Sequence, residues 1–221
     1  MPALILLILL PLGAIAAQLA LGLHGVPNML YKLCFLIPPF VYCWHQRVGI
    51  FSDIMRFQNW RRCLGVALGL AIVAIAVFWS VYYSLGDLLL DKEMISQKIT
   101  DQFTVNRNTV LLIAPITTFL NSLLEEFFYR GFAFGLLSRR NRLLGYLLPA
   151  AAFTMQHVLF FWFWRMSWIP FCVATVGLLV FALVLQRLYE KAGSIVAPWV
   201  VHMGGDMAMM GIAVGLLWFQ W

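Results

Sequence analysis

The sequence contains about seven apolar runs, and all but the second reach the roughly 20 residues that a membrane-spanning helix takes. A bilayer offers the backbone no hydrogen-bond partners, so each run is expected to be helical. Charged residues make up only 11% of the 221 residues, against about 25% in soluble domains. We therefore expect an all-α, polytopic membrane helix bundle, with spans at about 3–23, 29–44, 64–85, 109–137, 143–163, 169–188 and 194–219.

The second of these runs is the weakest, because it is short and contains Pro38 and Pro39. An eighth segment also remains open. The fourth run is longer than a bilayer needs, so we expect it to tilt or to break near Pro115.

Basic residues between the runs predict how the chain is oriented. With the N-terminus inside, loops 46–62, 138–142 and 186–194 hold nine Lys and Arg, whereas loops 87–108 and 164–168 hold four. The positive-inside rule then favours a cytoplasmic N-terminus, and the pattern suits a prokaryotic inner membrane. The net charge of +6 is interpreted as loop charge facing the lipid bilayer, so no nucleic-acid partner is expected.

Residues 86–108 form the only long polar stretch of the sequence. Ile95, Ile99 and Phe103 recur at four-residue spacing, which predicts an amphipathic helix on the membrane surface. Capping of a site, gating of substrate and a solvated connector all remain open as roles. This connector divides one integral membrane domain into N-terminal spans at 1–108 and a helical core at 109–221.

Two adjacent acids, Glu125 and Glu126, lie inside the fourth run. A charge at the bilayer centre costs at least about 2.5–3.5 kcal/mol, so such residues indicate a functional site. Glu126 and Arg130 are four residues apart and can pair on one helix face. The side chain of Glu125 is rotated about 100° around the helix axis from that of Glu126, so Glu125 is expected to be available for chemistry.

Two other runs carry buried polar residues at helical spacing. His157 follows Phe153 by four residues, and Asp206 follows His202 by four. Each group alone could be structural: an ion pair, a hydrogen-bonded histidine or a packing contact. Their joint occurrence on three runs favours function, because unpaired charge in lipid is costly.

These residue types together suit peptide hydrolysis inside the membrane. A Glu–His pair can activate a water molecule, and a second histidine with a carboxyl one turn away can stabilise the oxyanion that forms. The sequence contains neither an HExxH helix nor a GxSxG turn, which argues against the corresponding zinc and serine proteases.

The three motifs, in this order, resemble those of the CPBP family of CAAX proteases and bacteriocin-processing enzymes, also called the Abi family. That family's pattern is EExxxR, then FxxxH, then HxxxN or HxxxD. The matching segments cover about residues 109–215 and are Glu125-Glu126-Phe127-Phe128-Tyr129-Arg130, Phe153-Thr154-Met155-Gln156-His157 and His202-Met203-Gly204-Gly205-Asp206.

The resemblance implies a glutamate-type intramembrane endopeptidase. By this resemblance Glu125 matches the catalytic glutamate and His157 its partner in activating water, while His202 and Asp206 match the oxyanion-side pair. Glu126 and Arg130 would support them. We expect no cofactor. If a metal is used, Glu125, His157 and His202 could bind zinc.

The resemblance also bears on the substrate. The prenyl-protease branch usually has Asn where this chain has Asp206, and an ionised Asp cannot donate a hydrogen bond. This difference weakens assignment to the prenyl-protease branch. We therefore expect a membrane-anchored substrate such as a bacteriocin precursor, a sorting tail or a CAAX-like peptide. The alternatives are a non-catalytic membrane immunity or scaffold protein and a proton or ion transporter. The sequence leaves the oligomeric state open.

Overall fold

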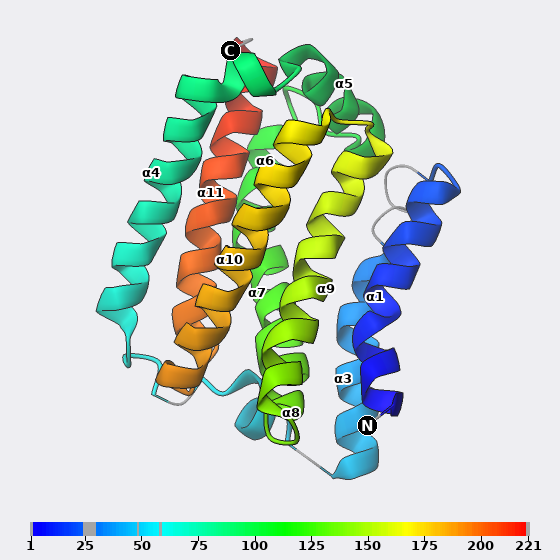
Figure 1. The fold of residues 1–221 in the computed structure, drawn as a ribbon, viewed down its shortest axis with the longest axis vertical. Coiled ribbons are helices and arrows are strands. Elements are labelled where there is room, and N and C mark those ends of the chain that lie inside the picture. Colours follow the sequence, from blue (N-terminus) through cyan, green and yellow to red (C-terminus); the bar gives the residue numbers. More distant parts are fainter. Residues whose placement is uncertain (1, 24–29, 48, 58, 220–221) are drawn as a thin grey trace.

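The computed structural model describes residues 2–23, 30–47, 49–57 and 59–219, and every regular element in them is a helix (Figure 1). In chain order these are α1 (Pro2–Ala20), η1 (Leu30–Lys32), α3 (Leu33–Gln46), η2 (Ile50–Met55), α4 (Leu64–Leu89), α5 (Lys92–Phe103), α6 (Val110–Ile116), η3 (Thr117–Asn121), α7 (Ser122–Glu126), η4 (Phe127–Phe134), α8 (Gly135–Leu137), α9 (Arg142–Phe163), α10 (Trp168–Ala192) and α11 (Val196–Phe219).

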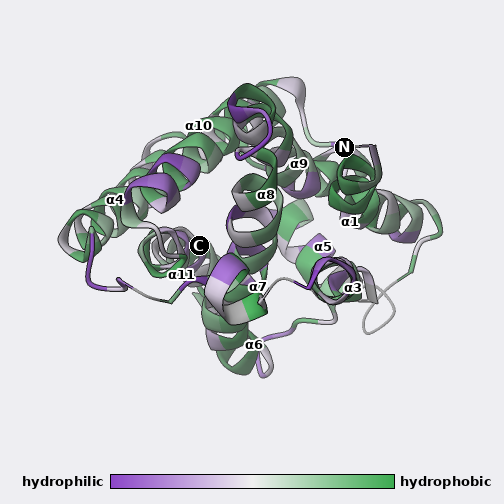
Figure 2. Cartoon of the chain, turned by 90° about the horizontal axis from the view of Figure 1, so that it is seen from below, coloured by the Kyte–Doolittle hydropathy of each residue, from purple (hydrophilic) through white to green (hydrophobic). Residues whose placement is uncertain are grey.

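Six helical segments of the described residues are long and apolar enough to cross a membrane. They agree within a few residues with six of the predicted spans: Pro2–Ala20, Leu64–Leu89, Val110–Leu137, Arg142–Phe163, Trp168–Ala192 and Val196–Phe219. The helices α1, α4 and α10 are mostly hydrophobic where they face outward (Figure 2). Large apolar side chains such as Ile72, Val77 and Val176 are more than half exposed there. The chain is an integral membrane protein.

The second predicted span corresponds to α3, which differs from the others in length. It has 14 residues, with Pro38 and Pro39 inside it. At 1.5 Å per residue it is about 21 Å long, shorter than the roughly 30 Å hydrocarbon core. Residue 29, where the predicted span starts, lies outside the described residues. In Figure 1, α3 begins part-way along the bundle and finishes at the end where α8 lies.

The fourth span is one continuous helical rod made of α6, η3, α7, η4 and α8. It passes through Pro115 and widens into π-helical turns at Thr117–Asn121 and again at Phe127–Phe134. These wide turns lie on either side of α7, the segment that carries the two acids. Such turns occur frequently at functional sites, because they change which side chains share a helix face.

Two glycines allow helices of this bundle to approach closely. A Cβ atom at Gly204 of α11 would lie 2.8 Å from Cβ of Ala71 on α4. A Cβ atom at Gly131 would lie 2.6 Å from the carbonyl oxygen of Ile54 in η2. A larger side chain at position 204 would push α4 away from α11, and one at position 131 would push η2 away from the rod.

The predicted amphipathic helix in the polar connector is α5. The side chain of Asp91 caps its N-terminus and accepts a hydrogen bond of 2.9 Å from the backbone N–H of Met94. Phe103 at its other end contacts the rings of Phe160 and Trp164, with centroid distances of 5.3 and 6.3 Å. The helix α5 thus lies at the end of the bundle where α9 ends (Figure 1).

Candidate active site

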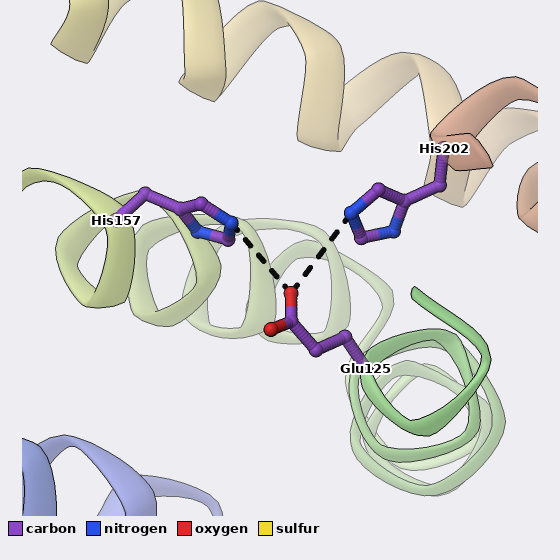
Figure 3. Close-up of side chains that lie close together, drawn as sticks. All are labelled: Glu125, His157 and His202. Atoms are coloured by element: carbon purple, nitrogen blue, oxygen red, sulfur yellow. Dashed lines mark ion pairs between the residues drawn. The ribbon is translucent and has the colours of Figure 1, made fainter. Parts of the chain in front are cut away.

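Three spans bring Glu125, His157 and His202 together inside the bundle (Figure 3). Oε2 of Glu125 on α7 lies 3.6 Å from Nε2 of His157 on α9 and 3.9 Å from Nε2 of His202 on α11. Glu125 is 1% exposed, and its Oε2 makes no hydrogen bond within the protein. A water oxygen about 2.8 Å from all three atoms would fit this triangle. Three of the six predicted site residues therefore converge on one point.

In both histidines a hydrogen bond at Nδ1 leaves Nε2 as the imidazole nitrogen that faces Glu125. Nδ1 of His157 lies 2.8 Å from the carbonyl oxygen of Phe153, which can only accept. The four-residue spacing of the FxxxH motif creates this contact within one helical turn. This contact assigns the tautomer of neutral His157: the proton is on Nδ1, and the lone pair of Nε2 faces Glu125.

His202 is held in the same way by the second acid of the pair. Its Nδ1 lies 2.7 Å from Oε1 of Glu126, a carboxylate acceptor. That oxygen also accepts a hydrogen bond of 2.8 Å from Nη1 of Arg130, in the predicted i,i+4 ion pair. Arg130 and Glu126 are both fully buried. Glu126 therefore holds His202 as well as pairing with Arg130, a contact that helix spacing alone did not predict.

The guanidinium of Arg130 links the first motif to the second. It lies over the ring of Phe153, with its central carbon 4.4 Å from the ring centroid. The same ring meets His202 edge-on at a centroid distance of 5.5 Å. Phe153 thus packs between Arg130 and His202 and supports the orientation of both.

Glu125 has ion-pair and hydrogen-bond partners at one of its two carboxylate oxygens. Oε1 accepts hydrogen bonds from Lys32 at 2.9 Å, from Gln156 at 2.9 Å and from Asn121 at 3.0 Å. The hydroxyl of Tyr129 donates to the amide oxygen of Gln156 at 2.6 Å, which directs the NH2 group toward Glu125. One oxygen of the carboxylate is fully engaged, and the other faces the histidines.

Sequence reasoning missed these partners for separate reasons. Lys32 stood at the edge of a predicted span, where basic residues usually face headgroups. Asn121 precedes Glu125 by four residues and so lies on the same helix face, a signal that could have found it. Gln156 is adjacent to His157 within the second motif, but adjacency alone does not say where its side chain points.

Asp206 lies beside the triangle without joining it. Its Oδ1 is 3.7 Å from Nε2 of His202, and the residue is 6% exposed. This distance is too long for a direct hydrogen bond. The predicted pairing of His202 with Asp206 is therefore a close approach along one face of α11.

The donor set around Glu125 fits a metal ion by chemistry. One carboxylate oxygen and two imidazole nitrogens lie within 4.8 Å of one another. Two histidines and a glutamate are a common ligand set for catalytic zinc, and each histidine has the outer hydrogen bond that metal ligands usually show. The ammonium group of Lys32 at the other oxygen of Glu125 would compete electrostatically with such a cation.

Residues 107–208 match the family model of type II CAAX prenyl endopeptidase Rce1-like proteins. Residues 107–208 are therefore similar to that family. The match agrees with the resemblance drawn from the three motifs, and the Rce1-like segment contains all six predicted site residues. No curated protein and no solved structure matches the chain. Lys32, which pairs with Glu125, lies outside the Rce1-like segment.

Proposed function

We propose that the protein is a glutamate-type intramembrane endopeptidase that hydrolyses a peptide bond in a membrane-associated protein or peptide. One observation carries this proposal. Oε2 of Glu125, which makes no hydrogen bond within the protein, faces Nε2 of His157 and Nε2 of His202 in the interior of a membrane bundle. The match of residues 107–208 to the Rce1-like family model supports an endopeptidase.

In the proposed mechanism, Glu125 is the general base. Oε2 of Glu125 and Nε2 of His157 hold a water molecule, and Glu125 takes one of its protons as the oxygen attacks the substrate carbonyl. A C–O bond forms and the carbonyl becomes a tetrahedral oxyanion. Glu125 then gives the proton to the amide nitrogen, the C–N bond breaks, and the products are a carboxylic acid and an amine.

His202 and Asp206 are proposed to act on the oxyanion side. Nε2 of His202 can donate a hydrogen bond to the oxyanion when the imidazole carries both protons. The carboxylates of Glu126 and Asp206 face opposite nitrogens of that ring, at 2.7 and 3.7 Å, and would compensate the positive charge of the imidazolium. If a zinc ion were bound by Glu125, His157 and His202, it would polarise the water or the carbonyl.

Exposure indicates the side from which a substrate reaches this site. The side chains of Glu125, His202 and Asp206 are at most 8% exposed, whereas those of His157 and Lys32 are 21% and 23% exposed. His157 belongs to α9, and Lys32 precedes α3. We propose that the substrate approaches where these two side chains are exposed and that it is a bacteriocin precursor, a sorting tail or a CAAX-like tail.

The proposed location is a prokaryotic inner membrane with the N-terminus in the cytoplasm. The N-terminus, α8 and the C-terminal end of α3 lie at one end of the bundle, and α5 and the C-terminus lie at the other (Figure 1). The excess of Lys and Arg in loops 46–62, 138–142 and 186–194 supports a cytoplasmic location for the first end under the positive-inside rule.

The proposal is tested with purified protein in lipid vesicles and membrane-anchored peptides of each substrate class. Mass spectrometry should find cleavage at a defined peptide bond, and the Glu125→Ala and His157→Ala variants should leave the peptide intact while remaining folded. Retained cleavage in either variant would contradict the proposal. A scaffold or immunity protein would keep its function in both variants, and a transporter would show ion flux that depends on Glu125.

A further inference from the structure

Lys32 is a cation at the proposed active site that comes from outside the Rce1-like segment. It ends η1, directly before α3, and its Nζ lies 2.9 Å from Oε1 of Glu125. The two residues are 93 positions apart in the chain, so tertiary packing alone brings them together. Among the described residues, no other Lys or Arg forms an ion pair with Glu125.

Aromatic packing holds Lys32 in this position. Nζ lies 4.8 Å from the ring centroid of Tyr31 and 5.3 Å from that of Phe35. Phe35 is fully buried and meets the rings of Phe128 and Tyr129 at 4.9 and 5.7 Å, which fixes the start of α3 against η4. The long side chain of Lys32 therefore has little freedom to leave the carboxylate.

The two oxygens of Glu125 are in different surroundings because of these donors. Three donors surround Oε1, from Lys32, Asn121 and Gln156, whereas Oε2 has no hydrogen bond within the protein. Rotation of the carboxylate out of its observed plane would stretch these three hydrogen bonds, so the donors hold one oxygen among them and leave the other facing the histidines. Of the three donors only Lys32 carries a charge, and it forms an ion pair with a carboxylate that is 1% exposed.

We propose that Lys32 is a positioning residue that fixes the carboxylate of Glu125, so that Oε2 alone is presented to the water and the two histidines. This inference rests on the proposed function and adds to it that the N-terminal part of the chain completes the active site. Lys32 acts through Glu125, so its loss should lower kcat and leave KM nearly unchanged.

The kinetic test compares Lys32→Met with Lys32→Arg on a substrate that the wild-type protein cleaves. Lys32→Met should lower kcat at least about tenfold with KM within about twofold, since a well-placed general base contributes roughly 10²–10⁴-fold. Lys32→Arg keeps the charge and the donors and should restore much of the rate. Lys191→Met, which removes an exposed lysine at the end of α10, is the matched control and should cleave like wild type.

A thermal-stability cycle tests the same contact without a substrate. Lys32→Met leaves a buried carboxylate unpaired and should lower Tm, whereas Lys32→Met combined with Glu125→Gln should recover part of that loss. Additive shifts of the two single variants would overturn the inference, and so would wild-type kcat in Lys32→Met. A wild-type protein that cleaves nothing would instead contradict the proposed function, and the thermal cycle would still decide whether Lys32 and Glu125 are coupled.

Discussion

Nδ1 of His202 lies 2.7 Å from Oε1 of Glu126, while Nε2 of the same ring lies 3.9 Å from Oε2 of Glu125. The two adjacent acids therefore face opposite nitrogens of one histidine. Glu126 also forms an ion pair with Arg130, so the carboxylate that bonds the ring of His202 is itself held in place. From this arrangement we propose different roles for the two glutamates: Glu126 orients the ring, and Glu125 acts on the water.

Replacing Glu126 by Gln tests this orienting role. The change keeps the side-chain shape but removes the charge that faces His202 and Arg130, so we expect cleavage to fall about 10–100-fold, as for other residues that orient functional histidines. Tm should also fall, because Arg130 would remain buried without its partner. Cleavage at the wild-type rate in Glu126→Gln would contradict the assignment.

The hydroxyl of Tyr129 is predicted to affect the cleavage rate by orienting the side chain of Gln156. Tyr129→Phe removes the 2.6 Å hydrogen bond that directs the Gln156 amide toward Glu125. We expect a several-fold lower kcat and a loss of stability of about 1 kcal/mol, measured by cleavage and thermal unfolding. Tyr146→Phe is the matched control: its hydroxyl bonds Glu190 at the end of the bundle, and its loss should leave kcat unchanged. Equal kcat in the two variants would contradict the prediction.

Asp206 gives a prediction about the oxyanion side. Asp206→Asn supplies an amide that can donate a hydrogen bond beside Nε2 of His202, so we expect cleavage at or above the wild-type rate. Asp206→Ala removes the group that faces the His202 imidazolium and should lower kcat at least about tenfold, given that one oxyanion donor, here His202, is worth roughly 10²–10³-fold. If both variants cleaved like wild type, Asp206 would have no part in the reaction.

Metal dependence is tested by chelation. The mechanism assigns water activation to Glu125 and His157, so protein treated with a strong chelator and verified to be metal-free by mass spectrometry should keep its cleavage rate. Loss of activity that added zinc restores would contradict that assignment. It would instead assign Glu125, His157 and His202 as ligands, because their donor atoms lie within 4.8 Å of one another.

The sequence predicted the spans well because apolar length alone determines them, and it predicted the convergence of Glu125, His157 and His202 because intramembrane charge is rare. The contact of Glu126 with His202 was missed, since it depends on how α7 packs against α11. Lys32 was missed for a similar reason: the start of α3 inside the bundle is a tertiary feature, and local hydropathy assigned the residue to a span end. The glycine contact between Gly204 and Ala71 likewise appears only once α4 and α11 are packed.

The proposed mechanism depends most directly on the carboxylate of Glu125 as the base. The decisive measurement is the initial cleavage rate of Glu125→Gln against wild type, in the same vesicles, on the same peptide and with equal amounts of folded protein. Gln keeps the shape of the side chain but cannot take a proton from water, so the rate should fall at least about hundredfold. A rate within about twofold of wild type would contradict the mechanism and remove Glu125 from the reaction.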